Sequence, residues 1–181
     1  MNRQDVLKIY KQHLDIHFAE DESRAILQWV KDYIEGCSDS EFKDLLTVED
    51  RSENLPPLRI FQALERLLNL EPVQYVFQTA FFHKYQFKVD SNTLIPRPET
   101  EELIELILQE NPKFSELNIR GLDIGTGSGC IPITLLKERL NWKFDAIDIS
   151  PDALNIAKFN AATLQVDNRI ERSEEHTSEL Q

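Results

Sequence analysis

The sequence predicts an α/β fold in which a small bundle of helices is followed by a β-hairpin and a parallel sheet. Apolar residues recur at helical spacing up to about residue 75, and an alternating stretch follows. The C-terminal half then reads strand, glycine-rich turn, helix, strand and helix. Because the strands are joined through helices by short connections, we expect them to be parallel with right-handed crossovers.

Residues 1–75 form the expected helical bundle. Its apolar residues fall on stripes that we expect to face a core: Val6, Leu7, Tyr10, Leu14, Ala25, Ile26, Trp29, Val30, Tyr33, Phe42, Leu45, Leu46, Leu58, Phe61, Leu64, Leu67 and Leu68. Ser38 and Glu41 have capping-box spacing, and Pro56-Pro57 marks a break. His13 and His17 lie one turn apart without a third ligand nearby, so we predict no metal site.

The pattern changes after the helical bundle. Residues 71–77 leave the helical pattern, and residues 80–82 and 85–89 alternate like the strands of a hairpin. Two prolines then bracket Arg97 before a helix that Glu99 or Thr100 is expected to cap. Prolines on both sides hold this cation in one direction, which favours a wall of the active site over a rigid connector.

The glycine-rich turn is the stretch that indicates a ligand. Residues 119–124 form a short apolar run typical of a buried parallel strand, and three glycines within Gly125–Gly129 separate it from the next helix. Such glycines let backbone N–H groups approach a ligand. The next strand, residues 144–149, carries Asp148 near its carboxyl end, where a carboxylate can accept both hydroxyls of a ribose. The two features predict a pocket for a nucleoside-containing cofactor.

The glycine spacing favours one cofactor over others. A dinucleotide fingerprint has glycines at the first, third and sixth places, but the sixth place here is Cys130. A P-loop needs lysine followed by serine or threonine, and neither pair is present. The spacing favours a loop over which the amino-acid end of S-adenosylmethionine can lie, while Asp148 binds the ribose of this cofactor. Two alternatives stay open at this point: a strand–helix turn without a ligand, and an NAD site with a degenerate fingerprint.

Composition sets wider limits. The chain has 181 residues, a formal net charge of −12, 41% hydrophobic and 29% charged residues, which is a soluble globular composition. The acidic balance disfavours a non-specific grip on nucleic acid. No apolar run is long enough to cross a membrane, no signal-peptide core is present, and two cysteines do not make a disulfide framework. We therefore expect a cytoplasmic monomer with no nucleic-acid or membrane partner.

The last ten residues, 172–181, break from the preceding pattern. They contain one apolar residue and resemble the translation of a sequencing-library adapter, so we interpret them as a non-native tail. On this interpretation the natural chain is interrupted within a domain, and exposed apolar surface predicts poor solubility.

Four stretches taken together resemble one family: Glu71-Pro72-Val73-Gln74-Tyr75, Leu94–Glu101, Leu122–Gly129 and Asp148-Ile149-Ser150. They are similar to the peptide chain release factor glutamine N5-methyltransferases, the HemK family, and the resemblance extends to about Glu171. The Pro-Arg-Pro-Glu-Thr run is distinctive, whereas many methyltransferases share the glycine loop. One departure is Gln78, where the family usually has glycine.

The resemblance implies a Rossmann-like class I S-adenosylmethionine-dependent methyltransferase fold with an incomplete parallel sheet. It divides the chain into a helical substrate-recognition domain (1–75), a β-hairpin linker (76–96), a partial methyltransferase domain (97–171) and the non-native tail (172–181). S-Adenosyl-L-methionine is the implied cofactor, and release factors are the implied partners. The implied cofactor-binding residues are Gly125, Thr126, Gly127, Ser128, Gly129 and Asp148, with Arg97 and Thr100 bordering the site.

The implied reaction transfers a methyl group to the glutamine amide in the Gly-Gly-Gln motif of release factors. The family places its catalytic Asn-Pro-Pro-Tyr motif after the fourth strand, and this sequence does not contain it. Asn111-Pro112 precedes the first strand of the sheet and is interpreted as a helix stop and loop. No catalytic residue is therefore predicted, and this chain is expected to be inactive. The alternatives are an adenine-type nucleic-acid N-methyltransferase and a non-catalytic cofactor-binding fragment.

Overall fold

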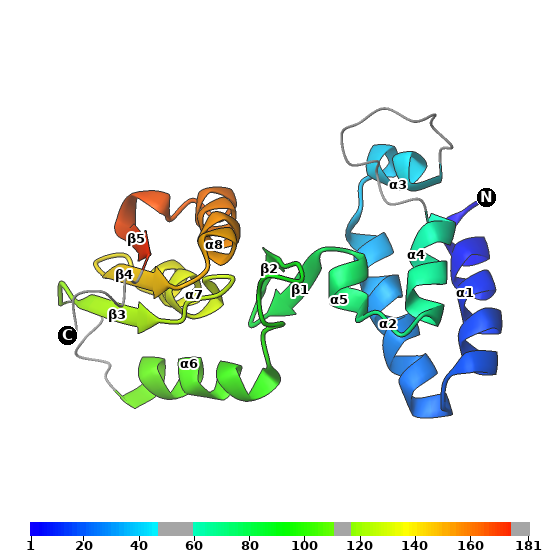
Figure 1. Cartoon of the computed structure of the whole chain (residues 1–181), viewed down its shortest axis with the longest axis horizontal. Helices are drawn as coiled ribbons and strands as arrows, with labels where there is room; N and C mark the ends of the chain where they lie inside the picture. Colours follow the sequence, from blue (N-terminus) through cyan, green and yellow to red (C-terminus); the bar gives the residue numbers. More distant parts are fainter. Residues whose placement is uncertain (47–59, 111–116, 175–181) are drawn as a thin grey trace. The chain divides into compact units, whose positions relative to one another are not determined.

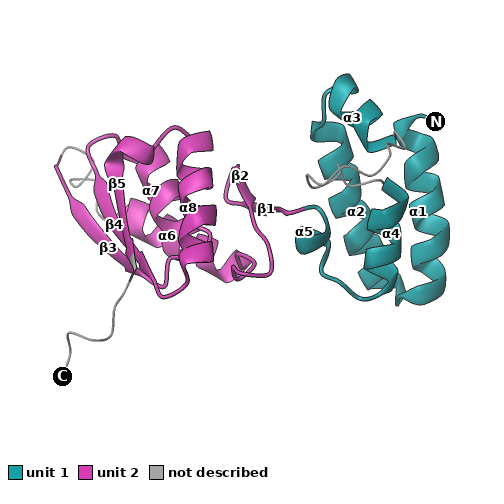
Figure 2. Cartoon of the chain, turned by 45° about the horizontal axis from the view of Figure 1, so that its top comes forward, with its two compact units in different colours: residues 1–77 teal, residues 78–181 magenta. Residues whose placement is uncertain are grey.

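The structure is a computed structural model that describes residues 1–46, 60–110 and 117–174. It separates into two compact units, Met1–Phe77 and Gln78–Gln181, drawn in teal and magenta in Figure 2. The chain order of the elements, coloured from blue to red in Figure 1, is α1 (Arg3–His17), α2 (Glu20–Gly36), α3 (Asp39–Leu46), α4 (Ile60–Leu68), α5 (Val73–Val76), β1 (Thr79–Phe82), β2 (Tyr85–Lys88), α6 (Pro98–Glu110), β3 (Arg120–Ile124), α7 (Cys130–Glu138), β4 (Lys143–Asp148), α8 (Pro151–Thr163), a 3₁₀ turn at Asp167–Arg169 and β5 (Ile170–Glu174).

Unit 1 is a bundle of helices around one apolar core. Val6, Tyr10 and Leu14 on α1 are fully buried, as the helical stripe predicts. Two residues do not follow the prediction: Ala25 on α2 is exposed, and 53% of Phe61 is exposed while Ile60 is buried in its place on α4. The proline break at 56–57 and Leu58 lie outside the described residues.

Two reciprocal caps begin helices of unit 1. The Ser38 N–H donates to Glu41 Oε2 at 2.7 Å, and the Glu41 N–H donates to Ser38 Oγ at 3.3 Å. The capping box predicted at this place is therefore confirmed. Asn2 and Asp5 form a second one at the start of α1. Both arrangements satisfy backbone donors that a helix leaves free at its N-terminus.

The stretch after α4 contains a helix, which the sequence pattern did not predict. The preceding helix α4 ends at Leu68, as the change of pattern predicts, but Val73–Val76 then forms the single turn α5, which was not predicted. Arg66 pairs with Glu71, with 2.7 Å between Nε and Oε2, and it also donates to the Val76 carbonyl at 3.2 Å. Glu71 therefore fastens the end of unit 1 to α4.

Replacing Tyr10 with phenylalanine tests the contribution of its buried hydroxyl group to the stability of this unit. The buried Tyr10 hydroxyl donates to the Ile60 carbonyl, and burial raises the pKa of Tyr10. Tyr10→Phe is expected to lower the free energy of unfolding by about 1 kcal/mol at neutral pH. Because the folded pKa lies above the unfolded one, wild-type stability falls as pH rises above about 10, and the variant escapes this loss. Urea unfolding should therefore show the difference between the two proteins narrowing in alkali; a constant difference would contradict this account.

The hairpin of unit 2 begins on a strained residue. Strands β1 and β2 pair antiparallel, with Ala80 opposite Phe87, as the alternating pattern predicts. Gln78, just before β1, has a φ of 50°, in the left-handed region where glycine is favoured. Its carbonyl accepts the Val89 N–H at 3.2 Å, which closes the base of the hairpin. This backbone conformation accounts for the glycine that the resembled family has at the position.

The sheet of unit 2 is parallel, with strand order β3-β4-β5. Figure 2 shows α6, α7 and α8 along one side of it, and α7 and α8 pack on β4. The predicted alternation of strands and helices is confirmed. Strand β5 continues through Arg172 and Ser173 to Glu174, where Arg172 lies opposite Ala146. The first three residues of the interpreted non-native tail thus continue this strand; the interpretation of residues 172–181 as non-native concerns their origin and stays a prediction, and residues 175–181 lie outside the described part.

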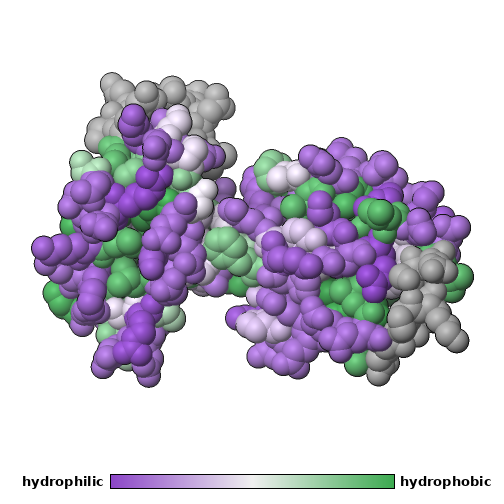
Figure 3. Space-filling model, turned by 180° about the vertical axis from the view of Figure 1, so that it is seen from behind, coloured by the Kyte–Doolittle hydropathy of each residue, from purple (hydrophilic) through white to green (hydrophobic). Residues whose placement is uncertain are grey.

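The other side of the sheet carries exposed apolar residues. Leu122 and Ile124 on β3 are 58% and 64% exposed, whereas Phe144 and Ala146 on β4 face the helices and are buried. Apolar surface on unit 2 is also visible in green in Figure 3. Among the side chains of α6 from Pro98 to Gln109, only Ile104 is fully buried. This helix begins at Pro98, so Glu99 and Thr100 lie within its first turn and the predicted cap was wrong.

Candidate functional site

The loop between β3 and α7 turns on three glycines. Gly125, Gly127 and Gly129 have φ values of 76°, 53° and 76°, all in the left-handed region that disfavours other residues. The N–H groups of Gly125 and Thr126 both donate to the Ile147 carbonyl, at 2.8 and 3.0 Å. The loop is therefore fixed to the carboxyl end of the neighbouring strand β4.

The glycines differ in the space around them. A Cβ atom added at Gly125 or Gly127 meets nothing within 4 Å, so the backbone there is open to a ligand. A Cβ at Gly129 would lie 2.9 Å from Cδ1 of Ile133 and 3.2 Å from Cβ of Ala157. The first two glycines leave room above the loop, and the third lets the loop pack against α7 and α8.

Asp148 reaches the glycine loop as the sequence predicts. It ends β4, and its carboxylate accepts the Gly127 N–H at 2.8 Å and the Ser150 N–H at 3.0 Å. Each carboxylate oxygen keeps a further lone pair, so a pair of ribose hydroxyls can still donate to it. The structure thus brings the loop and this acid together at the ends of two adjacent parallel strands, which is where open α/β sheets bind ligands.

Asp123 is a site residue to which the sequence analysis assigned no role. It lies on β3 two residues before the loop. Burial is the main cause that raises the pKa of Asp123, and the Asp148 charge raises it further. Within the described residues, Asp123 Oδ2 and Thr126 Oγ1 are buried without a hydrogen-bond partner. An acid at the end of a buried strand was the available sequence signal, but its burial depends on the tertiary structure.

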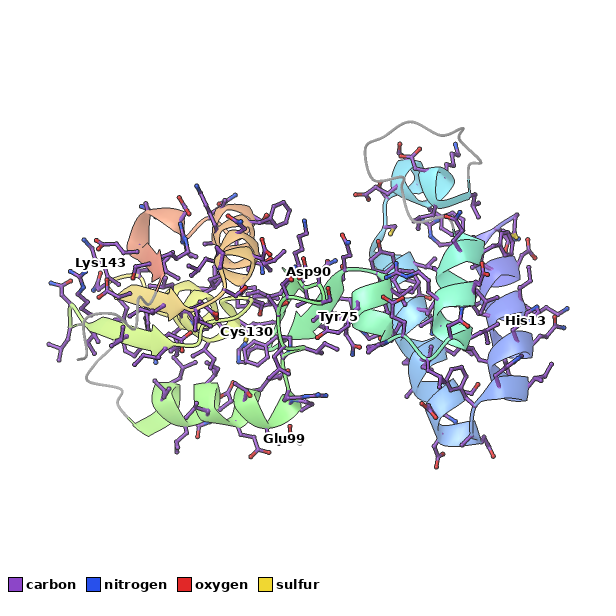
Figure 4. The ribbon with its side chains drawn as sticks, viewed as in Figure 1. His13, Tyr75, Asp90, Glu99, Cys130 and Lys143 are labelled. Carbon is purple, nitrogen blue, oxygen red and sulfur yellow. The ribbon has the colours of Figure 1, made fainter. Side chains whose placement is uncertain are left out.

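Cys130 follows the loop at the start of α7. Figure 4 shows it between the ends of β3 and β4 and the hairpin. Burial is the main cause that raises the pKa of its thiol to about 11, so the thiol stays protonated at neutral pH. A protonated thiol is a poor nucleophile. Cys130 therefore contributes packing at the site, and a nucleophilic role for it is disfavoured.

The two other predicted site residues are Arg97 and Thr100, at the start of α6. Arg97 is exposed just before α6, and its carbonyl accepts the N–H of the half-buried Thr100 at 3.0 Å. Neither side chain has a hydrogen bond to the glycine loop in the part of the chain that is described, so their role stays a prediction. His13 and His17 are exposed on α1, and the described residues hold no group of three metal-ligating side chains. The described helices include none that is long and apolar enough to span a bilayer.

Comparison with known families places the chain in a class. A family model described as RNA methyltransferase matches residues 80–180, which is more than half of the chain. The matched part contains the hairpin from its second residue on, the sheet and the glycine loop. The chain therefore belongs to this methyltransferase family.

Curated relatives are more specific in their names. The release factor glutamine methyltransferase of Flavobacterium psychrophilum is 45% identical over 124 residues, which cover 68% of this chain and 44% of the relative. That of Lactococcus lactis is 44% identical over 135 residues, which cover 75% of this chain and 43% of the relative. The chain thus spans less than half the length of these relatives. They confirm the resemblance that the four sequence stretches indicated.

Solved structures include similar proteins. One is a SAM-dependent methyltransferase from Geobacter sulfurreducens in complex with S-adenosyl-L-homocysteine. It is 26% identical, with a TM-score of 0.35, and the match covers 44% of this chain and 29% of that one.

The residues of the site fit the donor that a methyltransferase family implies, S-adenosyl-L-methionine. The space above Gly125 and Gly127 leaves backbone open to the amino-acid end of the donor. The unpartnered Asp123 oxygen is a suitable acceptor for an ammonium group, and Asp148 is a suitable acceptor for ribose hydroxyls. No lysine or arginine occurs within the loop itself, so a pyrophosphate would meet no cation there.

Proposed function

We propose that this chain is the donor-binding part of an enzyme that methylates the glutamine side-chain amide in the Gly-Gly-Gln motif of peptide chain release factors. The single observation that carries the proposal is the hydrogen bond of 2.8 Å between the Gly127 N–H and Asp148, which joins the loop and the acid into one site. The names of the curated relatives support the choice of substrate.

Each group of the site has a proposed task. When bound, S-adenosyl-L-methionine supplies an electrophilic methyl group on a positively charged sulfur. The open backbone at Gly125 and Gly127 contacts its methionine end, and Asp123 with the Thr126 hydroxyl accepts hydrogen bonds from its ammonium group. Asp148 accepts the ribose hydroxyls. The ammonium and sulfonium groups of the donor are both positive, so acidic side chains supply charge of the opposite sign, and this attraction is stronger in a partly buried site than in water.

The substrate half of the reaction requires further residues. An amide nitrogen is a poor nucleophile because its lone pair is delocalised into the carbonyl. A site that holds this nitrogen in line and accepts hydrogen bonds from its N–H groups favours the developing charge. The Asn-Pro-Pro-Tyr motif to which the resemblance assigns this task does not occur in the sequence. We therefore propose donor binding without methyl transfer for this chain alone, with the helices of unit 1 as the surface that recognises the release factor.

Calorimetry tests the donor half of the proposal. S-Adenosyl-L-homocysteine is expected to bind the chain with one-site stoichiometry, whereas NAD is expected to give no heat of binding. Mass spectrometry tests the substrate half: a longer form that contains the Asn-Pro-Pro-Tyr motif should add one methyl group to the Gly-Gly-Gln glutamine of a release factor. Binding of NAD in preference to S-adenosyl-L-homocysteine would overturn the proposal.

Methylation of a base in RNA is the second candidate, because the matching family model carries that description. Amides and exocyclic amines present a similar chemical problem, since both nitrogens have delocalised lone pairs. The formal net charge of −12 disfavours contact with a phosphate backbone. The same longer form incubated with RNA and labelled donor separates the two: label in RNA and none in the release factor would establish this alternative.

Asp123→Asn separates binding from stability at the site. Because burial raises the pKa of Asp123 in the folded chain, wild-type stability falls as pH rises from the unfolded pKa of about 3.9 to the folded one. The variant lacks this loss and is expected to be more stable than wild type at neutral pH, while its affinity for S-adenosyl-L-homocysteine falls about tenfold. Urea unfolding and calorimetry measure the two effects, with the exposed Asp152→Asn as control. A variant that is less stable and binds as well as wild type would contradict both roles.

A further inference from the structure

Asn160 on α8 lies where the hairpin, the helix and the glycine loop meet. Only 2% of it is exposed, and helix α8 packs against both β2 and β4. A buried amide costs free energy unless its donors and acceptor are satisfied, so the partners of this side chain are informative. None of the proposed roles in donor binding involves it.

The Asn160 amide is satisfied by two separate segments of backbone. Its Oδ1 accepts the Lys88 N–H at 2.7 Å, and its Nδ2 donates to the Lys88 carbonyl at 2.9 Å. The same Nδ2 donates to the Ser128 carbonyl at 2.9 Å. The side chain therefore pairs with β2 as a neighbouring strand would, and it holds the glycine loop with its second proton. With both amide protons in use, no donor proton is left for a ligand.

The same face of α8 supports the next residue of the loop. Ala157 lies one turn before Asn160, and a Cβ at Gly129 would be 3.2 Å from its Cβ. The Gly129 N–H donates to the Thr126 carbonyl at 2.8 Å, which closes the turn of the loop. Ser128 is 2% exposed between these contacts. Helix α8 thus fixes the end of the loop by one packing contact and one hydrogen bond.

We propose that Asn160 is a positioning residue that sets the conformation of the donor-binding loop and couples it to the hairpin. Displacement of Lys88 moves Ser128 directly, because one rigid amide holds both. The proposal rests on the proposed function for the identity of the ligand, S-adenosyl-L-methionine. The coupling itself is a property of the ligand-free chain and can be measured there.

Hydrogen exchange on the ligand-free chain tests the coupling. Asn160→Ala is expected to raise the exchange rates of the Lys88 and Gly129 amides at least tenfold, with the rates in β4 unchanged. Asn160→Asp keeps the acceptor and loses the donors, so the Lys88 amide should stay protected while the Gly129 amide is exposed. The exposed Asn155→Ala on the same helix is the matched control and should change neither. A uniform rise in exchange across unit 2 would mean a purely structural role and overturn the proposal.

Calorimetry with S-adenosyl-L-homocysteine adds the functional readout. Affinity should fall at least tenfold in Asn160→Asp and stay unchanged in Asn155→Ala; equal affinities would overturn the role in positioning. If wild type does not bind, the proposed function fails, and the exchange data still decide the coupling. Should both Asn160 variants unfold, the wild-type chain decides: the Asn160 side-chain protons should exchange at least tenfold more slowly than those of Asn155, and equal rates would overturn the proposal.

Discussion

Replacing Asp148 with alanine is expected to lower the affinity for S-adenosyl-L-homocysteine about 100-fold or more. A hydrogen bond to a charged acceptor contributes about 1.5–3 kcal/mol, and two ribose hydroxyls would lose one each. The substitution also releases the Gly127 and Ser150 N–H groups that the carboxylate accepts. Both consequences act in the same direction, so the effect on binding should be large. Calorimetric titration of the two proteins measures it.

A second substitution separates contact with the ribose from support of the loop. Asp148→Asn keeps one acceptor oxygen and removes the charge, so it should bind better than the alanine variant and worse than wild type. Asp152→Ala, at an exposed site in the first turn of α8, should bind as wild type does. If Asp148→Ala bound S-adenosyl-L-homocysteine as tightly as wild type does, the assignment of Asp148 to the donor site would be contradicted.

Alanine at Gly129 is expected to have the largest effect on stability among the loop substitutions. The residue has a φ of 76°, and its Cβ would approach Ile133 to 2.9 Å and Ala157 to 3.2 Å. A left-handed alanine costs about 1–2 kcal/mol, and overpacking adds about 1–3 kcal/mol. Gly129→Ala should therefore lower the free energy of unfolding by about 2–5 kcal/mol in urea titrations.

Gly125→Ala provides the matched comparison because its φ is also 76° but its Cβ meets nothing within 4 Å. Only the backbone strain of about 1–2 kcal/mol applies to its stability. The methyl group of this alanine projects into the space assigned to the donor. The affinity of Gly125→Ala for S-adenosyl-L-homocysteine should therefore fall, although the variant loses little stability. Equal destabilisation by the two alanines would contradict the packing described for Gly129.

The parts of the fold that depend on local pattern could be predicted from the sequence. The strand ending at Ile124, the glycines and the strand ending at Asp148 gave the parallel sheet and the meeting of loop and acid, because the carboxyl ends of adjacent parallel strands share one edge. The capping box at Ser38 followed from residue spacing alone.

Other features depended on tertiary contacts that no local pattern contains. The turn α5 is held to α4 by Arg66, which donates to the Val76 and Tyr75 carbonyls and lies outside the window of a four-residue helix. Phe61 is as apolar as its buried neighbours, and only the packing of α4 decides which of them faces the core. The burial of Asp123 depends on segments far apart in sequence. The three hydrogen bonds of Asn160 likewise join distant segments. Strand β5 passes residue 171 because strand β4 offers it partners up to Asp148.

The most direct test of the donor site is a map of backbone amide resonances as ligand is added. S-Adenosyl-L-homocysteine should shift the amides of Gly125, Gly127 and Ser150 first, since they lie on the loop and beside the carboxylate of Asp148. NAD at the same concentration should leave them in place. If S-adenosyl-L-homocysteine shifted only amide resonances of residues away from this loop, or if NAD shifted those of the loop instead, the assignment of a methyl-donor site would be contradicted.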